Sequence, residues 1–317
     1  MDTLHTMDTH HTMDTLHTMD TPLISVTGHL CIDWILTVDE FPPKGESRRL
    51  SSRERYFGGG AANIAAGIAA LGGEAELITS VGKDFAESGY ERYLAEKNIR
   101  THLYRSETKN CSTAFMVNSA AGDQITYFEW GAGEVFGRAE PPAREFLHMA
   151  TGDAAYNIRA AQKARFASLD PGQDVKYYTK EQCETLFAAI DLLICNNYEL
   201  DILQHTTGET AEEIIGKIPM TIITRGKEGS TLYRGDAGES SRIPAVLADA
   251  KDPTGAGDAY RAGLFTAMKK GYDIETACRV GAVTSSFAVE KTGTQTNLPG
   301  WEQMTERFET AFGTLTR

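Results

Sequence analysis

The sequence predicts an α/β protein: a doubly wound, mostly parallel sheet flanked by helices, with a small β-sheet lid. From about residue 145 onward, short apolar segments typical of buried strands alternate with helical patterns, which favours parallel strands joined by helices. Polar residues follow several of these segments, at the edge where open α/β sheets bind ligands. Two glycine-rich segments, 58–60 and 255–257, lead into apolar helical patterns, an arrangement that suits anion binding.

Composition narrows the class of partner. A chain of 317 residues can form one large α/β domain or two smaller ones. The net charge of −13 disfavours nucleic-acid polymers and anionic membranes. No apolar run approaches the length of about 18 residues that a membrane span needs, and we expect no secretory signal. Five cysteines without CxxC spacing fit a reducing cytosol, so we expect a cytoplasmic protein with small-molecule ligands.

The N-terminal segment differs from the rest of the chain. Residues 1–21 repeat a six-residue unit, MDTLHT, whose period matches neither a strand nor a helix face. We expect this low-complexity tail to be disordered, and the alternative is weak metal binding by its histidines. The folded domain is expected at 22–317, with the lid inserted at about 34–56 and 112–131.

The remaining elements follow from periodicity and turn residues. Residues 23–28 are typical of a buried first strand, and 34–38 and 48–56 of strands outside the main core. Residues 112–118 and 124–130 predict a hairpin rich in aromatic residues. Further strands are expected at 75–81, 146–151, 164–169, 192–195, 221–224 and 231–233, and helices at 61–73, 84–96, 260–270 and 274–289.

The segment DPTGAGDAYRAG, residues 252–263, predicts a turn that opens a helix with one buried face. Gly255, Ala256 and Gly257 are expected to present free N–H groups to an anion at the helix start. Asp258 lies in the same turn. It suits a base that takes the proton of a hydroxyl while the amides hold a phosphoryl group. The alternative is an ordinary acid favoured by the helix dipole.

The first glycine-rich segment suggests the other side of the same site. Gly58–Gly60 allows a ligand to approach the helix start, where Asn63 can donate to and accept from a ligand hydroxyl. Asp33 is expected just beyond the C-terminal end of a central strand, where a carboxylate can accept hydrogen bonds from a sugar. The alternatives are helix capping for Asn63 and a polar turn for Asp33.

Polar groups at four strand ends extend the predicted cleft. They lie at 151–153, 170–173, 196–199 and 224–229. The amide and carboxylate in the third group can orient water around Mg²⁺, which takes few protein ligands. An aromatic side chain of the hairpin can stack on a flat ligand such as a nucleobase. Taken singly, each group is also explained by helix capping or sheet packing.

Together these segments resemble the ribokinase/PfkB family of small-molecule kinases, from about Leu23 to the end of the chain. The motifs GGGAANIAAGIAALGG and DPTGAGDAYRAG carry the resemblance. The shorter motifs NxxE (Asn196–Glu199) and TRGKEG (Thr224–Gly229) fall between them in family order. The resemblance implies a βαβ core with a small β-sheet lid. It also implies ATP with Mg²⁺, and phosphorylation of a primary alcohol.

The resemblance also implies roles residue by residue. The catalytic group is Asp258 as base with Gly255, Ala256 and Gly257 as anion hole. The substrate group is Asp33, Gly59 and Asn63, to which we add Gly60, Phe128 and Asp153. The ATP group is Thr224, Gly226, Gly229 and Asn196, and the metal group is Glu199, Asn196 and Asp170. Asp252 and the GTQTNLP loop fall where some family members hold a monovalent cation.

Within the family, the segments GHLCIDWILTVDEFP, SGYERYL and QITYFEWGA are similar to archaeal broad-specificity nucleoside kinases. Ribokinases usually have a lysine where this chain has Gly60, which leaves more room near the sugar. We therefore expect transfer of the ATP γ-phosphate to the 5′-hydroxyl of a nucleoside. The alternative within the class is a kinase of ribose, fructose or a sugar phosphate, and from another class a nucleotide-binding regulator. Exposed lid edges favour a homodimer.

Overall fold

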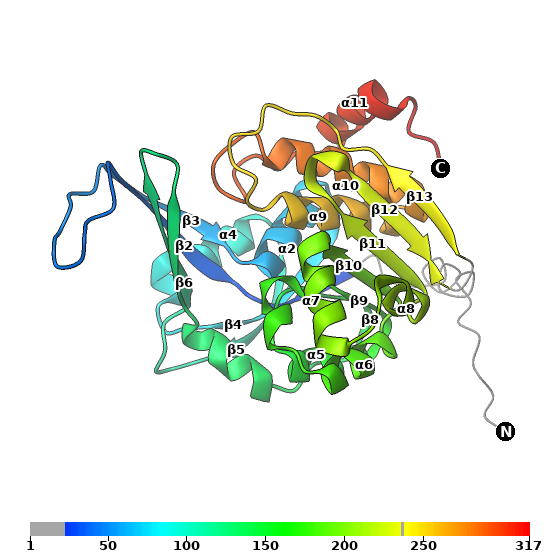
Figure 1. Cartoon of the computed structure of the whole chain (residues 1–317), viewed down its shortest axis with the longest axis horizontal. Helices are drawn as coiled ribbons and strands as arrows, with labels where there is room; N and C mark the ends of the chain where they lie inside the picture. The colour runs from blue at the N-terminus through cyan, green and yellow to red at the C-terminus, as the bar shows by residue number, and fades with distance from the viewer. Residues whose placement is uncertain (1–22, 236–237) are drawn as a thin grey trace.

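The computed structural model describes residues 23–235 and 238–317, so the predicted tail at 1–21 lies outside the described residues. Most of the described chain is built on a nine-stranded sheet with the order β13-β12-β11-β10-β9-β8-β1-β4-β5 (Figure 1). Its strands are β1 (Leu23–Thr27), β4 (Glu74–Val81), β5 (Arg100–Arg105), β8 (Arg144–Met149), β9 (Ala164–Leu169), β10 (Leu192–Asn196), β11 (Met220–Thr224), β12 (Ser230–Arg234) and β13 (Glu239–Ile243).

The direction in which strands are added reverses at β1. From β1 the chain adds β4 and β5 on one side, and then returns to add β8, β9, β10 and β11 in order on the other. All these neighbours pair in parallel, whereas β12 and β13 pair antiparallel at the edge. In open α/β sheets, ligands bind at the C-terminal strand ends beside such a reversal. The topology therefore places the candidate site near the ends of β1 and β8.

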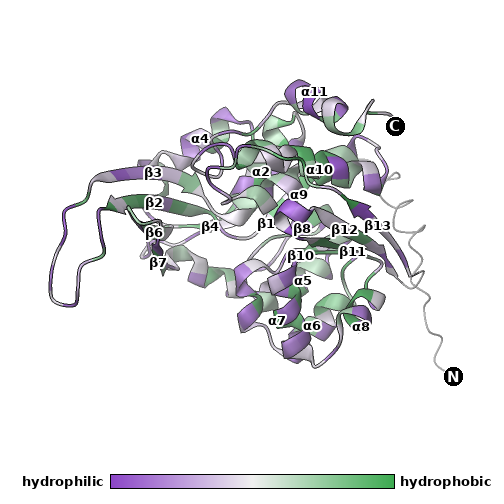
Figure 2. Ribbon diagram, turned by 45° about the horizontal axis from the view of Figure 1, so that its top comes forward, coloured by the Kyte–Doolittle hydropathy of each residue, from purple (hydrophilic) through white to green (hydrophobic). Residues whose placement is uncertain are grey.

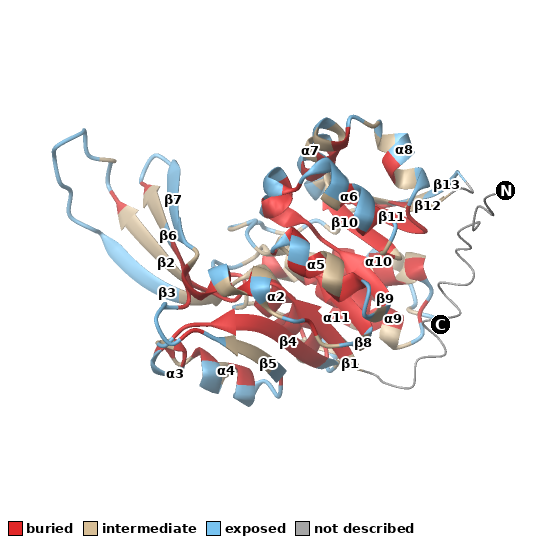
Figure 3. Ribbon diagram, turned by 90° about the horizontal axis from the view of Figure 1, so that it is seen from below, coloured by how far each residue is buried: buried red, intermediate tan, exposed pale blue. Residues whose placement is uncertain are grey.

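Helices cover both faces of this sheet (Figure 3). One face carries α5 to α8, and the other carries α2, α9, α10 and α11 (Figure 1). The helices are α2 (Gly60–Ala70), α3 (Phe85–Ser88), α4 (Tyr90–Glu96), α5 (Ala154–Ala161), α6 (Lys180–Phe187), α7 (Asn197–Thr207), α8 (Ala211–Gly216), α9 (Ala256–Lys269), α10 (Ile274–Ala288) and α11 (Trp301–Phe312). Short 3₁₀ segments lie at Gly131–Arg138, Gly172–Tyr177 and Gly226–Glu228. None of the helices in the described ranges is long and apolar enough to cross a membrane.

The central strands are apolar on both sides, which is why the sheet needs two layers of helices (Figure 2). Along β10, Leu192 and Ile194 belong to the core under α2, α9 and α10, while Leu193 and Cys195 belong to the core under α5 to α7. Successive side chains of a strand point to opposite faces, so each such strand contributes to both cores. Packing on both faces holds each central strand in place, and therefore also positions the polar residues that follow its C-terminal end.

A second sheet projects from the main body with the order β3-β2-β6-β7 (Figure 3). Its strands are β2 (Cys31–Val38), β3 (Ser52–Gly58), β6 (Ser112–Ser119) and β7 (Gln124–Glu129). The structure thus confirms the predicted α/β class with a small separate sheet. The predicted hairpin is β6 and β7, which pair antiparallel.

Several local predictions were wrong. The single helix expected at 84–96 is two short helices, because Gly89 between them has φ of 81°. Helix α9 does not bury one face only: ten of its residues, 259–268, are buried, because α2 and α10 pack against it. Strands β5 and β13 were not predicted.

Candidate active site

The start of α9 forms one wall of the site. Gly255 caps the helix with φ of 80°, a left-handed conformation that favours glycine. Within the described residues, the amides of Gly257 and Asp258 donate to no backbone carbonyl, as expected at a helix start. The expectation of a free amide was wrong for Ala256, whose N–H donates to the carbonyl of Pro253 at 3.2 Å. Of the three predicted amides, those of Gly255 and Gly257 thus donate to no backbone carbonyl among the described residues, and the amide of Asp258 joins them.

Asp258 lies beside these amides and is half-buried. Its Oδ2 accepts a hydrogen bond of 2.8 Å from Nδ2 of Asn63, in the first turn of α2. Its Oδ1 faces Gly60, where an added Cβ would lie 3.7 Å from that oxygen. Burial raises the pKa of Asp258 from 3.8 to about 6, against the hydrogen bond from Asn63, which lowers it. The carboxylate is thus ionised near neutral pH but holds a proton more readily than an ordinary aspartate, which suits a general base.

A buried ion pair lies directly behind the start of α9. The guanidinium of Arg261 is 2.7 Å from Oδ2 of Asp170, at the end of β9. An added Cβ on Gly257 would lie 2.6 Å from Nη1 of the same arginine, so the guanidinium packs against the turn. Burial and the nearby Asp170 charge raise the pKa of Glu199 to about 7. The site therefore holds several carboxylates around one buried cation.

The glycines before α2 are shaped by contacts with strand β2. An added Cβ on Gly59 would lie 2.5 Å from the carbonyl of His29, and φ at Gly59 is 94°. An added Cβ on Gly58 would lie 1.9 Å from Oδ2 of Asp33, so the carboxylate fills that space. The predicted place of Asp33 was wrong: it lies within β2 of the small sheet, because the chain leaves the main sheet at Gly28.

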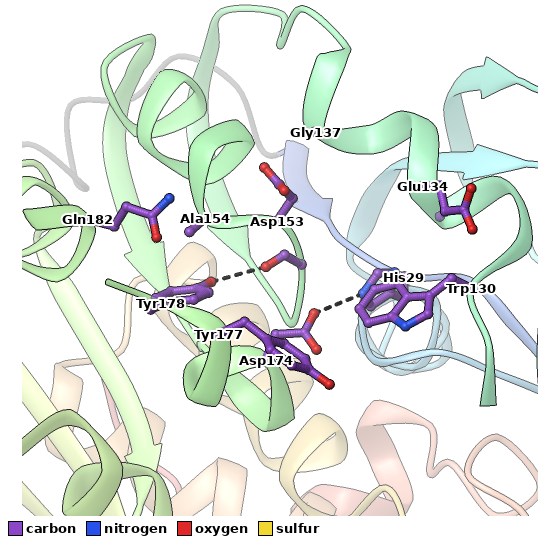
Figure 4. A pocket seen from close by; sticks show the side chains of 12 residues that line it. His29, Trp130, Glu134, Gly137, Asp153, Ala154, Asp174, Tyr177, Tyr178 and Gln182 are labelled. Carbon is purple, nitrogen blue, oxygen red and sulfur yellow. Dashed lines mark hydrogen bonds and ion pairs between the residues drawn. The ribbon is translucent and has the colours of Figure 1, made fainter. Parts of the chain in front are cut away.

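A cavity of about 170 Å³ opens beside this wall (Figure 4). His29 follows β1 and donates from Nε2 to Oδ2 of Asp174 at 3.1 Å. The ring of Trp130 meets the imidazole edge-on with centroids 5.1 Å apart. The cavity is lined by His29, Trp130, Gly133, Glu134, Gly137, Gly152, Asp153, Ala154, Asp174, Tyr177, Tyr178 and Gln182. Of the predicted substrate residues, Asp153 lines the cavity. Phe128 is not among the lining residues, and its ring lies 6.4 Å from that of His29.

The cavity borders the Asp258 wall through Thr151 and Gly152, which follow β8. An added Cβ on Gly60 would lie 3.9 Å from Oγ1 of Thr151, and the next residue, Gly152, lines the cavity. The side chain of Asp153 also has a structural role, because it caps α5 by accepting from the amide of Tyr156 at 2.8 Å. The order along this path is Asp258, Gly60, Thr151 and then the cavity.

The predicted nucleotide and metal residues lie at the ends of β9, β10 and β11. Asn196 and Glu199 cap α7 reciprocally, with each side chain accepting from the backbone amide of the other. Thr224 ends β11 and donates to the carbonyl of Cys195 at 3.5 Å. Close packing explains why position 229 is a glycine, because an added Cβ on Gly229 would lie 2.1 Å from the carbonyl oxygen of Ile243. The space beside Gly226 is open.

The donor set here suits a metal that keeps most of its water. No cluster of three or more His, Cys, Asp or Glu side chains that could hold a metal occurs at 23–235 or 238–317. Asp170 already pairs with Arg261, and one oxygen of Glu199 caps a helix. Mg²⁺ is usually bound through one or two carboxylates together with substrate phosphates and water. The remaining oxygen of Glu199 fits that mode, and an all-protein cage is not needed.

Sequence reasoning missed several residues of the site. His29 and Asp174 gave no local signal, because their contact joins residues 145 positions apart. Thr294 and Gln295 were noted only as members of the GTQTNLP loop, where the family resemblance implies a monovalent cation, yet both donate hydrogen bonds to Asn63. Arg261 stands in the recognised DPTGAGDAYRAG segment, where it was considered only as a contact for a phosphorylated acceptor and not as the ion-pair partner of Asp170.

Comparison with known proteins places this geometry in context. The family description "pfkB family carbohydrate kinase" matches residues 21–301. A nucleoside kinase of Methanocaldococcus jannaschii is 39% identical over 293 residues, which cover 90% of this chain and 96% of that protein. A nucleoside kinase of Methanothermobacter thermautotrophicus is 35% identical over 301 residues, covering 92% and 96%.

Solved structures agree with the sequence comparison. The crystal structure of the Methanocaldococcus jannaschii nucleoside kinase, described as an archaeal member of the ribokinase family, matches with a TM-score of 0.88 at 38% identity. The match covers 92% of this chain and 99% of that one. The Burkholderia thailandensis nucleoside kinase in complex with inosine matches with a TM-score of 0.78 at 27% identity, covering 92% and 99%.

Proposed function

The chain belongs to the pfkB family of carbohydrate kinases, and we propose that it transfers the γ-phosphate of ATP to the 5′-hydroxyl of a nucleoside. It is a phosphotransferase that acts on a hydroxyl group. One observation carries the proposal: Oδ1 of Asp258 faces the space beside Gly60, next to the free amides of the α9 start. A hydroxyl in that space meets a base on one side and an anion-binding turn on the other.

In this proposal the acceptor hydroxyl gives its proton to Asp258 as its oxygen attacks the γ-phosphorus of ATP, and ADP leaves. The amides of Gly257 and its neighbours in the turn, with the α9 dipole, stabilise the charge on the transferring group. Of the predicted anion-hole amides, those of Gly255 and Gly257 keep this proposed role, whereas the amide of Ala256 donates to Pro253 within the turn. Most of the rate enhancement then comes from positioning and charge stabilisation, as is general for phosphoryl transfer.

The ribose is proposed to lie between Asp33, Gly59, Gly60 and Asn63. Asp33 is largely buried, and its burial raises the pKa of its carboxyl. A sugar diol donates hydrogen bonds and can satisfy such a carboxylate without adding charge. The side-chain-free face of Gly60 leaves room for the 5′ carbon beside Asp258.

The cavity is proposed to hold the nucleobase. It borders the sugar position through Thr151 and Gly152, and it combines aromatic walls with the hydrogen-bonded pair of His29 and Asp174 (Figure 4). Aromatic side chains such as Trp130 offer a flat apolar surface to a base. Phe128 and Asp153 are proposed to complete the pocket.

The nucleotide end is proposed to use Thr224, Gly226, Gly229 and Asn196 for ATP. Mg²⁺ is proposed to be held through Glu199, Asn196 and water. The predicted metal residue Asp170 is proposed to contribute indirectly, because it pairs with Arg261. Such an ion, when bound, would offset the negative charge of the phosphate groups. A monovalent cation near Asp252 remains part of the proposal. Oδ2 of Asp252 accepts a hydrogen bond of 3.3 Å from the amide of Gly293, which belongs to the GTQTNLP loop.

A sugar-phosphate acceptor fits the cavity poorly. Its lining contains three carboxylates, those of Glu134, Asp153 and Asp174, and neither lysine nor arginine. A phosphorylated sugar would bring its own negative charge into that surface. The lining therefore favours an uncharged acceptor with a base over the alternative of a sugar-phosphate kinase.

We propose a homodimer through the outer face of the small sheet. The strand register places Trp34, Phe115 and Tyr127 beside one another on one face. Phe115 is 37% exposed and Tyr127 64% exposed, and β7 is a free edge strand within the described sheet. Apolar exposed faces and free edges commonly mark association sites.

All five cysteines are buried and free, which supports a reducing, cytoplasmic location.

The test is an acceptor screen with Mg²⁺ and ATP. Inosine, guanosine, cytidine and adenosine are compared with ribose, fructose and fructose 6-phosphate, and the product is identified by phosphorus NMR. We expect nucleoside 5′-monophosphates, and no turnover with 5′-deoxynucleosides. Turnover of a free sugar without turnover of any nucleoside would refute the substrate assignment.

A further inference from the structure

The amide of Asn63 is held in one orientation by a loop distant in sequence. Its Oδ1 accepts from Oγ1 of Thr294 at 2.8 Å and from Nε2 of Gln295 at 2.7 Å. An amide oxygen can only accept and an amide nitrogen can only donate. Two donors on one side therefore fix the other side, so that Nδ2 faces Asp258.

Gln295 is itself held from behind. Its Nε2 also lies 2.9 Å from the hydroxyl of Tyr90, which donates to the carbonyl of Gly58 at 2.8 Å. Oε1 of Gln295 is buried and has no partner among the described residues. Leaving a buried acceptor unpaired costs about 1–3 kcal/mol. The side chain thus gives up one hydrogen bond to keep both of its donor contacts, which is the kind of local cost found at functional sites.

The same loop also contacts the anion-binding turn. An added Cβ on Gly255 would lie 2.8 Å from Cβ of Thr294, so the threonine packs against the residue that caps α9. Gly293 donates its amide to Asp252 just before that turn. Residues 293–295 therefore touch both the partner of the base and the start of the helix that carries the base.

These contacts distinguish the two oxygens of Asp258. Oδ2 is engaged by Asn63 at 2.8 Å, whereas Oδ1 faces the space beside Gly60. If the amide of Asn63 turned over, its oxygen would face Oδ2, acceptor against acceptor. The carboxylate would then lose its anchor and could rotate away from the acceptor.

We propose that Thr294 and Gln295 are positioning residues of the transfer step, a proposal that rests on the proposed function. They fix Asn63 so that it anchors Oδ2, and Oδ1 is the atom that takes the hydroxyl proton. As that proton moves to Oδ1, the acceptor oxygen bonds to the γ-phosphorus and the bond from phosphorus to the ADP oxygen breaks. The loop acts through Asn63 and touches neither reacting atom.

Two pairs of variants test this. Thr294→Val removes the hydroxyl at nearly constant shape, and Thr294→Ser keeps it. Gln295→Glu keeps the shape but cannot donate to Asn63, and accepts instead, which favours the turned-over amide. Thr292→Val, at an exposed threonine of the same loop, is the matched control. Thermal unfolding checks that each variant is folded.

We expect kcat with saturating nucleoside and ATP to fall about tenfold or more in Gln295→Glu and in Thr294→Val, as for loss of a hydrogen bond to a buried polar group. KM for ATP should stay within about threefold, because the nucleotide contacts lie elsewhere. Thr294→Ser should recover kcat well above the valine variant, and Thr292→Val should match wild type.

Equal kcat for the serine and valine variants, or a folded Gln295→Glu protein with wild-type kcat, would overturn the proposal. Failure of the proposed function is seen separately, in the wild-type protein, as absence of turnover with nucleosides. If the wild type instead phosphorylates a sugar, the same variants are measured with that sugar. The expected ranking is unchanged, since the proton transfer is the same.

Discussion

The guanidinium of Arg261 lies 2.7 Å from the carboxylate of Asp170, and both side chains are only 6% exposed. This pair links the first turns of α9 to the end of β9. Removing one member of a buried ion pair leaves the other charge unpaired, which typically costs about 3–5 kcal/mol. We therefore expect Arg261→Met to lower the free energy of unfolding by about that amount, measured by urea denaturation.

The double variant Asp170→Asn with Arg261→Met is the control for that experiment. It removes both charges of the pair, and asparagine can still accept from the amide of Gly172, as Asp170 does at 3.0 Å. Most of the lost stability should return. A double variant no more stable than Arg261→Met would contradict this account.

Gly60 offers a way to block the acceptor without changing the fold. Its backbone is helical, and an added Cβ would point between Asp258 and Thr151 at 3.7 and 3.9 Å. We expect Gly60→Leu to raise KM for the nucleoside at least about tenfold, because the leucine side chain would occupy the space of the acceptor hydroxyl and weaken nucleoside binding. KM for ATP should not change. Gly216→Leu, at an open position on α8, is the matched control, and equal effects of the two variants would contradict this account.

The contact between His29 and Asp174 predicts a residue that affects base preference. Asp174→Asn replaces a carboxylate that accepts from the imidazole, and so changes the hydrogen-bonding groups in the cavity. We expect the ranking of kcat/KM among inosine, guanosine, cytidine and adenosine to change by about tenfold for at least one base. Asp201→Asn, at an exposed residue of α7, should keep the wild-type ranking. An unchanged ranking in Asp174→Asn would place the base elsewhere.

The raised pKa of Asp258 predicts the pH dependence of activity. Its pKa is about 6, because burial disfavours the charged form. A general base must be ionised, so kcat/KM for the nucleoside should rise with pH and level off above about 6. A profile that is flat down to pH 4.5 would contradict the assignment of this residue as the base.

The raised pKa of Asp258 also predicts that the stability of the folded protein falls as pH rises, whereas activity rises. A carboxyl whose folded pKa lies above its unfolded value of 3.8 binds its proton more tightly when folded, so its ionisation disfavours folding as pH rises from about 4 to beyond 6. At pH 7 this amounts to on the order of 3 kcal/mol. Asp258→Asn should therefore be more stable than wild type at pH 7, with the difference vanishing near pH 4. Urea unfolding at the two pH values measures it.

The sequence was sufficient for the class of fold and for the two glycine-rich helix starts. Apolar segments such as 164–169 and 192–195 are buried on both faces, so composition alone marks them as central strands. Strand β13 (Glu239–Ile243) was missed because its residues are mostly polar and it pairs only at the sheet edge. Helix α9 was expected to have one buried face, because the sequence does not show how many helices will pack against it.

The site was predictable where a motif determines local backbone geometry, and not where distant side chains meet. The turn around Asp258 follows from its own glycines. The hydrogen bond from Asn63 to Asp258 spans 195 residues, and the loop at Thr294 and Gln295 reaches Asn63 from more than 230 residues away. Such contacts arise only from tertiary packing. Capping by Asn196 and Glu199 was foreseen as an alternative to a ligand role, and the structure shows the capping.

Turnover by Asp258→Asn tests the central claim most directly, with ATP binding measured in parallel by calorimetry. Asparagine keeps the shape and can still accept from Asn63, but it cannot take a proton from the acceptor. We predict a loss of at least about 10²- to 10⁴-fold in kcat, the usual contribution of a general base, with the affinity for ATP within about threefold of wild type. Substantial remaining turnover in the folded variant would contradict the account.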